Sequence, residues 1–489
     1  MKKTKDFISG ILALTMVSGL AACSDSNVNS GETENTTASA AATTTGVTAS
    51  INTEGLKDGE QEVLENAMSQ LRDVELENKE IKWLAHYSQN PGTDGRSKGV
   101  ALEMFEQKYG AHIKDYITTY ENRFNDLSSY VLGGEGIDFF PGDDAYNFPK
   151  GVISGMFQPV DDYIDVNSPL WQNTKKGMEI FNFGGKHFAF VTNITAEQVC
   201  VYNKATIEEN GFDDPWELYE AGEWNWDTFQ KMLEDFVDED NGTYGLDGYF
   251  YEKALWTSAG AVAVDNVDGH VKSMLNDATL EKAENFGYEL YRKGLTFNRE
   301  LFNWNTQPQN MSTGNELFYL VGAWNVSGDP TTWETQIPPE DLGIVPVPSP
   351  ADSEPYGAAT MAGFALCKGA QNPLGVALYA ECNIVGSTDE GAVAVSDRKS
   401  MDDNQWSQEI VDRVKVCDEL VRQYPVYDLA PGCSTDVADY TVNDSVVGLR
   451  APFHGVSDWA TQREMLADTI EGLVQEVDGQ LQSKITEFN

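Results

Sequence analysis

Apolar and polar residues alternate in a regular order between residues 80 and 140. Short apolar runs typical of strands are separated by segments whose apolar residues recur at helical spacing and end in glycine. The expected elements are a strand at 81–85, a helix at 100–109, a strand at 113–118, a helix at 124–131 and a strand at 137–140. This order predicts a parallel sheet covered by helices, the α/β fold class.

Polar residues follow two of these strands directly. Tyr87 comes just after the first strand, and Asp143 and Asp144 come just after the third. Ligands of parallel sheets bind outside the carboxyl ends of the strands, so we expect these three residues to face a binding site. Two alternatives stay open at this point. In one, Tyr87 is a surface loop residue; in the other, Asp144 caps a helix.

The N-terminus has the features of an export signal. Three lysines precede a short apolar stretch that ends in Leu20-Ala21-Ala22-Cys23. This sequence resembles the lipobox of bacterial lipoproteins, which implies that residues 1–22 are a signal peptide and that Cys23 carries lipid. The alternative is a plain signal peptide with an incidental cysteine. Residues 23–79 are mostly small, polar or acidic, and we expect a flexible linker there, with a frayed helix as the alternative for the acidic residues 52–77.

The charge of the chain excludes several classes of ligand. The formal net charge is −45, which repels phosphate backbones and makes nucleic acids and other polyanions poor partners. No apolar run long enough to cross a membrane follows the N-terminal signal. The five cysteines after Cys23 form no CxxC pair and no Cys/His cluster, so we expect neither a metal nor another cofactor. A Cys417–Cys433 disulfide remains open.

Several short segments, taken in order, are similar to one known family. They are FEQKYG at 105–110, MFQPVDDYI at 156–164, GGKHFAF at 184–190, VYNK at 201–204, WNWDTF at 224–229, GAW at 322–324, GIVPVP at 343–348 and GAQNP at 369–373. Together they resemble the extracellular solute-binding proteins of ABC importers, specifically the carbohydrate-binding group that includes maltose-binding protein. Each segment is weak alone, but their order and spacing extend over most of the chain.

This resemblance implies a two-lobed fold hinged by crossing segments, in which each lobe is a mixed, mainly parallel sheet flanked by helices. The expected first lobe comprises residues 80–198 and 366–430, and the second comprises 199–365 and 431–489. The crossings are expected at 199–202 and 361–366. A ligand would be buried between the lobes, and membrane permease subunits would then receive it from a monomeric, lipid-anchored receptor on the outer face of the bacterial cytoplasmic membrane.

Sugar sites combine aromatic rings with carboxylates, amides or guanidinium groups. Trp324 is the first candidate, because the tryptophan at this place in the family often stacks on a sugar. Trp256 lies in a segment that the family uses near the cleft. Core packing is the alternative for both tryptophans. Arg450 and Phe453 are further candidates, although no family motif aligns there.

An enzyme is the competing interpretation. The sequence contains no GxSxG, no P-loop and no HExxH motif, and it has only five histidines. A glycoside hydrolase needs two carboxylates across a cleft, but 78 acidic residues create such pairs by chance. We therefore expect a binding protein for a sugar or oligosaccharide. An exported glycan-capture protein that is not coupled to transport remains an alternative.

Overall fold

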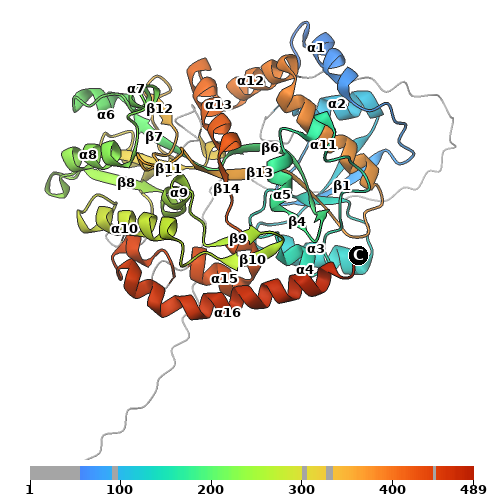
Figure 1. Ribbon diagram of the computed structural model, residues 1–489. Coiled ribbons are helices and arrows are strands. Elements are labelled where there is room, and N and C mark those ends of the chain that lie inside the picture. Colours follow the sequence, from blue (N-terminus) through green and yellow to red (C-terminus); the bar gives the residue numbers. More distant parts are fainter. Residues whose placement is uncertain (1–54, 91–96, 300–304, 327–333, 444–447, 489) are drawn as a thin grey trace, which may run out of the picture. The chain divides into compact units, whose positions relative to one another are not determined.

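The computed structural model describes residues 55–90, 97–299, 305–326, 334–443 and 448–488 (Figure 1). The predicted signal peptide, Cys23 and most of the expected linker lie outside these residues. Within the described part, every helix is too short or too polar to cross a membrane. The folded body from residue 55 onward contains two separate main sheets, which define two lobes.

The sheet of lobe 1 has six strands in the order β14-β13-β3-β1-β2, with β6 also paired to β13. The strands are β1 (Glu80–Ala85), β2 (His112–Ile117), β3 (Phe139–Pro141), β6 (Ala189–Ala196), β13 (Gly357–Leu366) and β14 (Pro425–Val426). Strand β1 runs parallel to both β2 and β3. The helices between them are α2 (Val100–Tyr109) and α3 (Arg123–Gly133). The predicted β-α-β-α-β order is confirmed.

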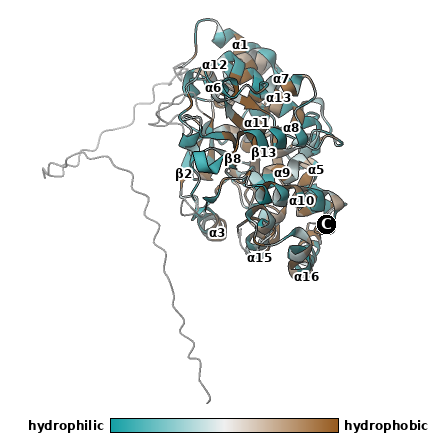
Figure 2. Cartoon of the chain, turned by 90° about the vertical axis from the view of Figure 1, so that its left-hand side faces the viewer, coloured by the Kyte–Doolittle hydropathy of each residue, from teal (hydrophilic) through white to brown (hydrophobic). Residues whose placement is uncertain are grey.

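Local sequence explains these elements. Trp83 of β1 is fully buried and packs against Phe139 of β3, with ring centroids 4.7 Å apart. Helix α2 ends at Gly110, whose φ of 59° is left-handed and favours glycine. Strand β2 is mostly hydrophilic in Figure 2, because it lies at the edge of the sheet and exposes alternate residues.

The sheet of lobe 2 has four strands in the order β12-β7-β11-β8. They are β7 (Val199–Asn203), β8 (Tyr244–Gly248), β11 (Glu316–Val321) and β12 (Leu342–Val345). The helices of this lobe are α6 (Lys204–Glu209), α7 (Pro215–Glu220), α8 (Trp226–Phe236), α9 (Tyr251–Ser258) and α10 (Ala278–Arg292). Asn225 caps α8 by accepting hydrogen bonds from two backbone amides. Trp226 stacks on Phe286 at 4.1 Å, which anchors α8 to α10.

The chain crosses between the sheets at other positions than expected. Residues 199–202 belong to β7 in lobe 2, and residues 361–366 belong to β13 in lobe 1. The crossings are instead the two residues between β6 and β7 and the longer segment 346–356 between β12 and β13. Lobe 1 therefore resumes near residue 357 and not at 366. Buried strands and buried crossings are both apolar runs, so their sequences look alike.

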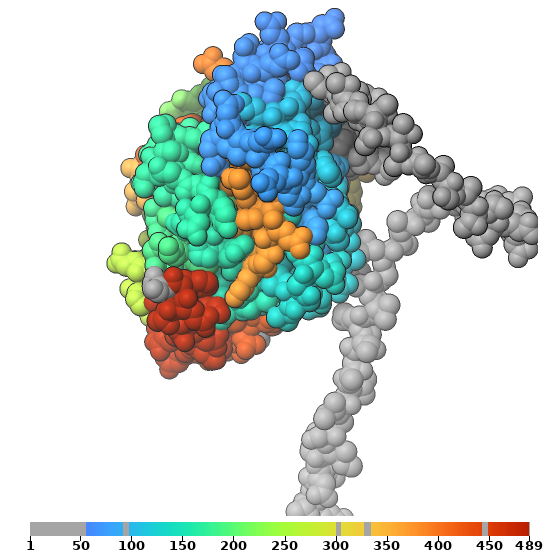
Figure 3. All heavy atoms as spheres, turned by 90° about the vertical axis from the view of Figure 1, so that its right-hand side faces the viewer, coloured from blue at the N-terminus to red at the C-terminus, as the bar shows by residue number. Residues whose placement is uncertain are grey.

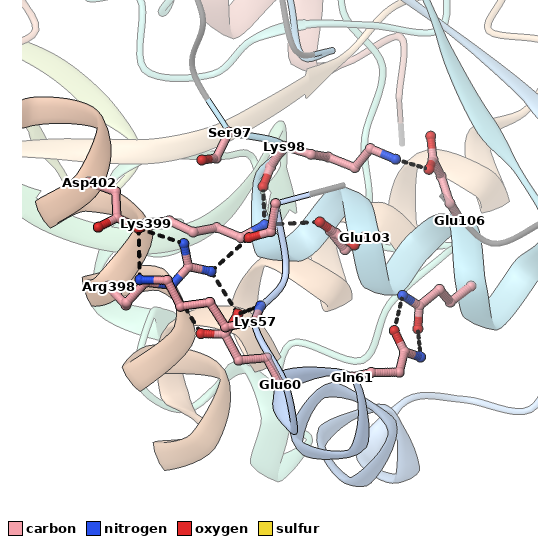
Figure 4. Close-up of polar contacts among 12 residues, drawn as sticks. Lys57, Glu60, Gln61, Ser97, Lys98, Glu103, Glu106, Arg398, Lys399 and Asp402 are labelled. Atoms are coloured by element: carbon pink, nitrogen blue, oxygen red, sulfur yellow. Dashed lines mark hydrogen bonds and ion pairs between the residues drawn. The ribbon is translucent and has the colours of Figure 1, made fainter. Parts of the chain in front are cut away.

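The expected linker also ends earlier than residue 79. Helix α1 (Glu60–Ala67) and the 3₁₀ turn Met68–Gln70 are folded, and they bury Leu64 and Leu71 against lobe 1. Arg398 of α12 (Glu390–Asn404) pairs with Glu60 at 2.7 Å and thereby fixes α1 (Figure 4). The many outward-facing acidic residues of this segment conceal its apolar side in the sequence.

Three helices follow β13, namely α11 (Pro373–Thr388), α12 and α13 (Gln408–Gln423). The chain then continues through α14 (Ala430–Cys433), α15 (Thr435–Ala438), a π-helical turn (Asp439–Asn443), a 3₁₀ turn (Ala451–His454) and the long α16 (Trp459–Ile485). Helices α11 and α2 pack together on lobe 1, whereas α13 packs on β6 and β13 of lobe 1 and on β12 of lobe 2.

Helix α16 touches both lobes, although residues 431–489 were expected in lobe 2 alone. Arg463 near its start pairs with Glu281 of α10 at 2.7 Å. Asp478 accepts a hydrogen bond from the backbone of Val271 in a hairpin formed by β9 (Val264–Val267) and β10 (His270–Ser273). Beyond the helix end, Phe488 contacts Phe188 of lobe 1 with ring centroids 5.3 Å apart. Figure 3 shows the red C-terminal residues against the green surface of lobe 1.

Candidate functional site

The ends of three parallel strands in lobe 1 meet around aromatic side chains. His86 and Tyr87 follow β1, and Tyr120 follows β2. The ring of His86 lies 5.0 Å from that of Tyr87 and 5.2 Å from that of Tyr120. Tyr87 is half-buried, and Tyr120 is 49% exposed. The ends of β1 and β2 thus place aromatic rings side by side, and Tyr87 lies at the sheet edge where ligands of parallel sheets bind.

Asp144 is held by Arg123, a buried residue at the start of α3. Arg123 Nη2 donates to Asp144 Oδ1 at 3.2 Å, and its guanidinium carbon lies 3.7 Å from the centroid of the Tyr120 ring. Asp144 also accepts a hydrogen bond from the backbone of Tyr146. Its carboxylate is therefore occupied within lobe 1, and it positions Arg123 and the Tyr120 ring.

Asp143 has a different environment. Among the described residues, no other side chain forms an ion pair or hydrogen bond with its carboxylate. Asp143 is exposed at the surface, but the protein around its carboxylate removes part of its hydration. This desolvation, with a further contribution from the charge of Asp144, raises the pKa of Asp143 to about 6. Asp143 is thus the carboxylate at these strand ends that is free to accept hydrogen bonds from a ligand.

Lobe 2 also presents aromatic residues at strand ends. Tyr249 and Phe250 follow β8, and Trp324 follows β11. Their exposed fractions are 36%, 48% and 79%. Of the five strongly exposed aromatic residues in the described part of the chain, Tyr291 alone lies away from a strand end. Large rings normally avoid solvent, so these exposed rings at strand ends are candidates for contact with a ligand.

The Gly-Ala-Trp segment has a steric explanation. The indole of Trp324 folds back over Gly322, and a Cβ atom at Gly322 would lie 2.0 Å from Trp324 Nε1. Any larger residue at position 322 would displace the ring. The glycine therefore sets the direction in which the exposed tryptophan points.

The Tyr249–Phe250 pair is held by a residue of the first crossing. Gln198 Nε2 donates to the carbonyl oxygens of Tyr249 at 2.5 Å and of Phe250 at 3.2 Å. Phe250 has a φ of 55°, which is unusual for a bulky residue. Arg450 lies 5.7 Å from the centroid of the Phe250 ring. Such local strain is common at functional sites, and here it orients an exposed ring.

Charged residues connect the two sets of strand ends. Lys253 of α9 pairs with Glu197 of the first crossing at 2.9 Å. Burial alone would lower the pKa of Lys253, but the Glu197 carboxylate raises it. The pKa of Tyr427 is raised by burial and then by the charges of Glu197, Asp144 and Asp143. The lobe 1 carboxylates and the first crossing therefore surround one region.

Three of the predicted site residues have structural roles. Trp256 is 2% exposed and Phe453 is fully buried, with ring centroids 6.2 Å apart. Phe453 also covers Gly287 of α10. Arg450 pairs with the buried Glu252 at 2.6 Å. Trp256 and Phe453 thus follow the alternative of core packing, and Arg450 is held by a buried carboxylate.

Sequence reasoning missed Tyr120, Tyr249 and Phe250. The signal that could have found them is position, since each follows a strand whose neighbour in the sheet also ends in polar or aromatic residues.

Trp304 and Trp333, which lie in polar loops of the sequence, are outside the described residues. Cys417 and Cys433 are buried free thiols, so no disulfide joins them. The described ranges hold no cluster of side chains suited to a metal ion.

Comparison with known proteins identifies the family. The sequence profile of the bacterial extracellular solute-binding proteins matches residues 91–377, more than half of the chain. The chain belongs to this family. Curated protein sequences gave no match. Solved structures, in contrast, match the solute-binding protein over most of its length.

Those structures share its two-lobed fold at low sequence identity. The ABC substrate-binding protein Lmo0181 from Listeria monocytogenes, in complex with cycloalternan, is 14% identical with a TM-score of 0.54, over 84% of this chain and 100% of that one. The cyclic alpha-maltosyl-1,6-maltose binding protein from Arthrobacter globiformis is 12% identical with a TM-score of 0.55, over 84% and 100%. UspC from M. tuberculosis is 14% identical with a TM-score of 0.55, over 81% and 100%.

Proposed function

We propose that this solute-binding protein captures a sugar or oligosaccharide between its lobes and delivers it to the permease of an ABC importer. The observation that carries the proposal is the gathering of exposed rings at the strand ends, with the unpaired carboxylate of Asp143 among them. Rings match the apolar faces of a sugar, and a carboxylate accepts its hydroxyl protons. The proposed contacts are Tyr87, Tyr120 and Asp143 in lobe 1 and Tyr249, Phe250 and Trp324 in lobe 2.

Binding would work without covalent chemistry. A ligand that touches both lobes binds the closed arrangement more tightly than the open one, so it shifts the hinge equilibrium toward closure. Glu197 and Gln198 occupy the first crossing and contact lobe 2 directly, so rotation there would move Tyr249 and Phe250 relative to Asp143. The permease would then recognise the closed arrangement.

Solved structures of similar fold support an oligosaccharide. Two of them are named for, or hold, cyclic sugars, namely cycloalternan and cyclic alpha-maltosyl-1,6-maltose. Four exposed rings spread over both lobes offer more than one stacking surface, which suits a ligand of several sugar units. Glucose oligosaccharides, linear and cyclic, are therefore the first compounds to test.

The proposal includes the export route. The lipobox-like sequence supports lipid attachment at Cys23 after removal of residues 1–22, which would hold a monomeric receptor on the outer face of the cytoplasmic membrane. Metabolic labelling with an alkyne palmitate analogue tests this attachment. Label on the exported wild-type chain and none on Cys23→Ser would support it, and equal labelling of both would contradict it.

The functional test measures sugar binding by the chain without residues 1–22. A ligand at about 100 times its Kd raises stability by about 2.7 kcal/mol, which shifts the melting temperature measurably. A panel of mono- and oligosaccharides, amino acids and peptides identifies the ligand class. A shift with one glycan class supports the proposal. Consumption of the sugar would instead indicate an enzyme.

Coupling to transport needs a separate measurement. Deletion of the gene should abolish uptake of the identified glycan, and the Cys23→Ser chain should restore uptake poorly if the anchor holds the receptor near its permease. Unchanged uptake, together with retained binding, would favour the alternative of an exported glycan-capture protein that is not coupled to import.

A further inference from the structure

A cavity of about 490 Å³ lies beside strands β6 and β13 of lobe 1, on the side where α11 packs. Its walls come from the start of α2, from α11, α12 and α13, and from the middle of β6 and β13. None of the six proposed contact residues lines it. Of the lining residues, Gln89 is the closest in sequence to a proposed contact residue, since it lies two residues after Tyr87. The cavity is therefore distinct from the site formed by those six residues, which we call the strand-end site.

The polar lining of the cavity has unused hydrogen-bonding capacity. Within the described ranges, the hydroxyl groups of Ser396 and Ser400 have no hydrogen-bond partner, and neither does the side-chain nitrogen of Asn193. The side-chain oxygen of Asn193 accepts a hydrogen bond from the backbone of Ile194. Donors and acceptors therefore face the cavity together, as a polyhydroxy ligand requires.

The charges of the lining cancel. Lys415 pairs with Asp397, and Arg422 lies 4.0 Å from Asp418. These four ionic groups, two of each sign, carry no net charge, so the lining favours neither an anion nor a cation. The ligand that fits is consequently neutral and polar.

One wall is apolar and carries an aromatic ring. The half-buried indole of Trp406 lines the cavity beside Val393, Val411 and Val414. A ring next to hydroxyl and amide groups offers the two contacts that a sugar uses, an apolar face and a hydrogen-bonding rim. The volume falls within the range of small-molecule sites, about 300–1,000 Å³. It suits one or two sugar units.

One wall of the cavity, helix α12, is fixed to lobe 1, whereas the other, helix α13, is attached to both lobes. Helix α12 is joined to lobe 1, since Lys399 Nζ lies 2.9 Å from Glu103 Oε1 and 2.5 Å from the carbonyl oxygen of Lys98 (Figure 4). Helix α13 is held by both lobes: Arg413 donates to the hydroxyl of Tyr202 in lobe 2 at 2.9 Å, and Asp418 accepts a hydrogen bond from the backbone of Ala196 in lobe 1 at 2.8 Å. The cavity thus changes shape when the lobes move.

Two further contacts tie this side of the cavity to lobe 2. Glu409 of α13 pairs with Lys204 of α6 at 2.9 Å. Trp406 Nε1 donates to the carbonyl oxygen of Val326, just beyond the Trp324 turn, at 3.0 Å. The ring that lines the cavity is therefore attached to the same segment that presents the exposed tryptophan of the strand-end site.

We propose that this cavity is a second binding site, for a neutral mono- or disaccharide, and that its occupation changes the hinge equilibrium. A ligand that contacts α12 and α13 together binds some lobe arrangements better than others, so its affinity and that of the strand-end site are coupled reciprocally. The effect on the hinge rests on the proposed function, whereas binding in the cavity does not.

Trp406 provides a local probe. The chain without residues 1–22 is labelled with 5-fluorotryptophan, and the ¹⁹F resonance of Trp406 is assigned by its absence in Trp406→Phe. D-glucose and maltose are then titrated into the Trp324→Ala variant, in which binding at the strand-end site is weakened, so that the two sites saturate at different sugar concentrations. We expect the Trp406 resonance to shift with saturation, and Ser396→Phe in the same background to abolish that shift by filling the cavity. Ala394→Phe, on the exposed side of α12, is the matched control and should leave it unchanged.

The outcomes separate the two proposals. A Trp406 shift that persists in Trp324→Ala and disappears with Ser396→Phe supports the second site, even where the strand-end site binds no glycan. A shift that occurs only when Trp324 is intact reports lobe closure and overturns the second site. No shift with either sugar, or a shift unaffected by Ser396→Phe in a variant that unfolds at the same temperature as its control, also overturns it.

Discussion

Replacing Trp324 with alanine tests the strand-end site most directly. The side chain is 79% exposed, so its removal costs the folded protein little, within about 0.5 kcal/mol. A tryptophan ring offers roughly 200 Å² for contact. If a sugar covers one face, about 80 Å² is buried at about 25 cal/mol per Å², or about 2 kcal/mol. Trp324→Ala should therefore weaken binding roughly 30-fold.

Isothermal titration calorimetry with the glycan from the stability screen measures this change. Tyr291→Ala is the matched control, because Tyr291 is also an exposed ring but lies on α10 away from the strand ends. Gly322→Ala provides a graded variant, since its new methyl group would push the indole aside without removing it. We expect its loss of affinity to fall between those of the wild type and Trp324→Ala. Equal affinity of Trp324→Ala and wild type would refute the assignment of this ring.

Three other changes test separate parts of the structure. Burial raises the pKa of Asp143 from 3.8 to about 6, so its carboxyl gains a proton as the pH falls through 6. Glycan binding measured by calorimetry should therefore be about 1 kcal/mol weaker at about pH 5 than at about pH 8. Asp143→Asn should not show this difference. Phe250→Gly relieves a left-handed φ and should raise the free energy of unfolding by up to about 1 kcal/mol, seen as a higher melting temperature, while it weakens glycan binding. A lower melting temperature would contradict the strain argument. Lys399→Met leaves the buried Glu103 without its ion-pair partner and should cost about 3–5 kcal/mol in urea unfolding, and adding Glu103→Gln should recover part of that loss.

The first sheet could be predicted closely because local signals agree with the tertiary structure. Strand β1, helix α2 and strand β2 each fall within a residue or two of the expected positions, since their apolar periodicity and the stop at Gly110 are set by nearby residues. The crossings could not be placed in this way. Whether the chain at Val199 continues one sheet or joins another depends on pairing with β11 and β12, which lie more than a hundred residues away.

The same distinction applies to the site. Tyr87 and Asp143 each follow a strand of the same sheet, and because parallel strands share one edge, both lie at that edge; their contact with a ligand stays a prediction. Residue type alone did not separate the exposed Trp324 from the buried Trp256. That difference depends on what packs above each ring, and for Trp256 it is Phe453, from a segment almost two hundred residues later. Burial of aromatic residues is thus a tertiary property that a short motif does not contain.

Helix α16 has a mechanical consequence. An α-helix resists bending, and this one of 27 residues is attached to α10 near its start and to lobe 1 just beyond its end. The two lobes are consequently joined by a stiff rod along one side, and large separations there would break its end contacts. The remaining freedom is rotation about an axis near the rod, so points far from α16 travel farther than points beside it. We therefore expect the protein to open by rotation about one axis beside α16, with few alternative motions.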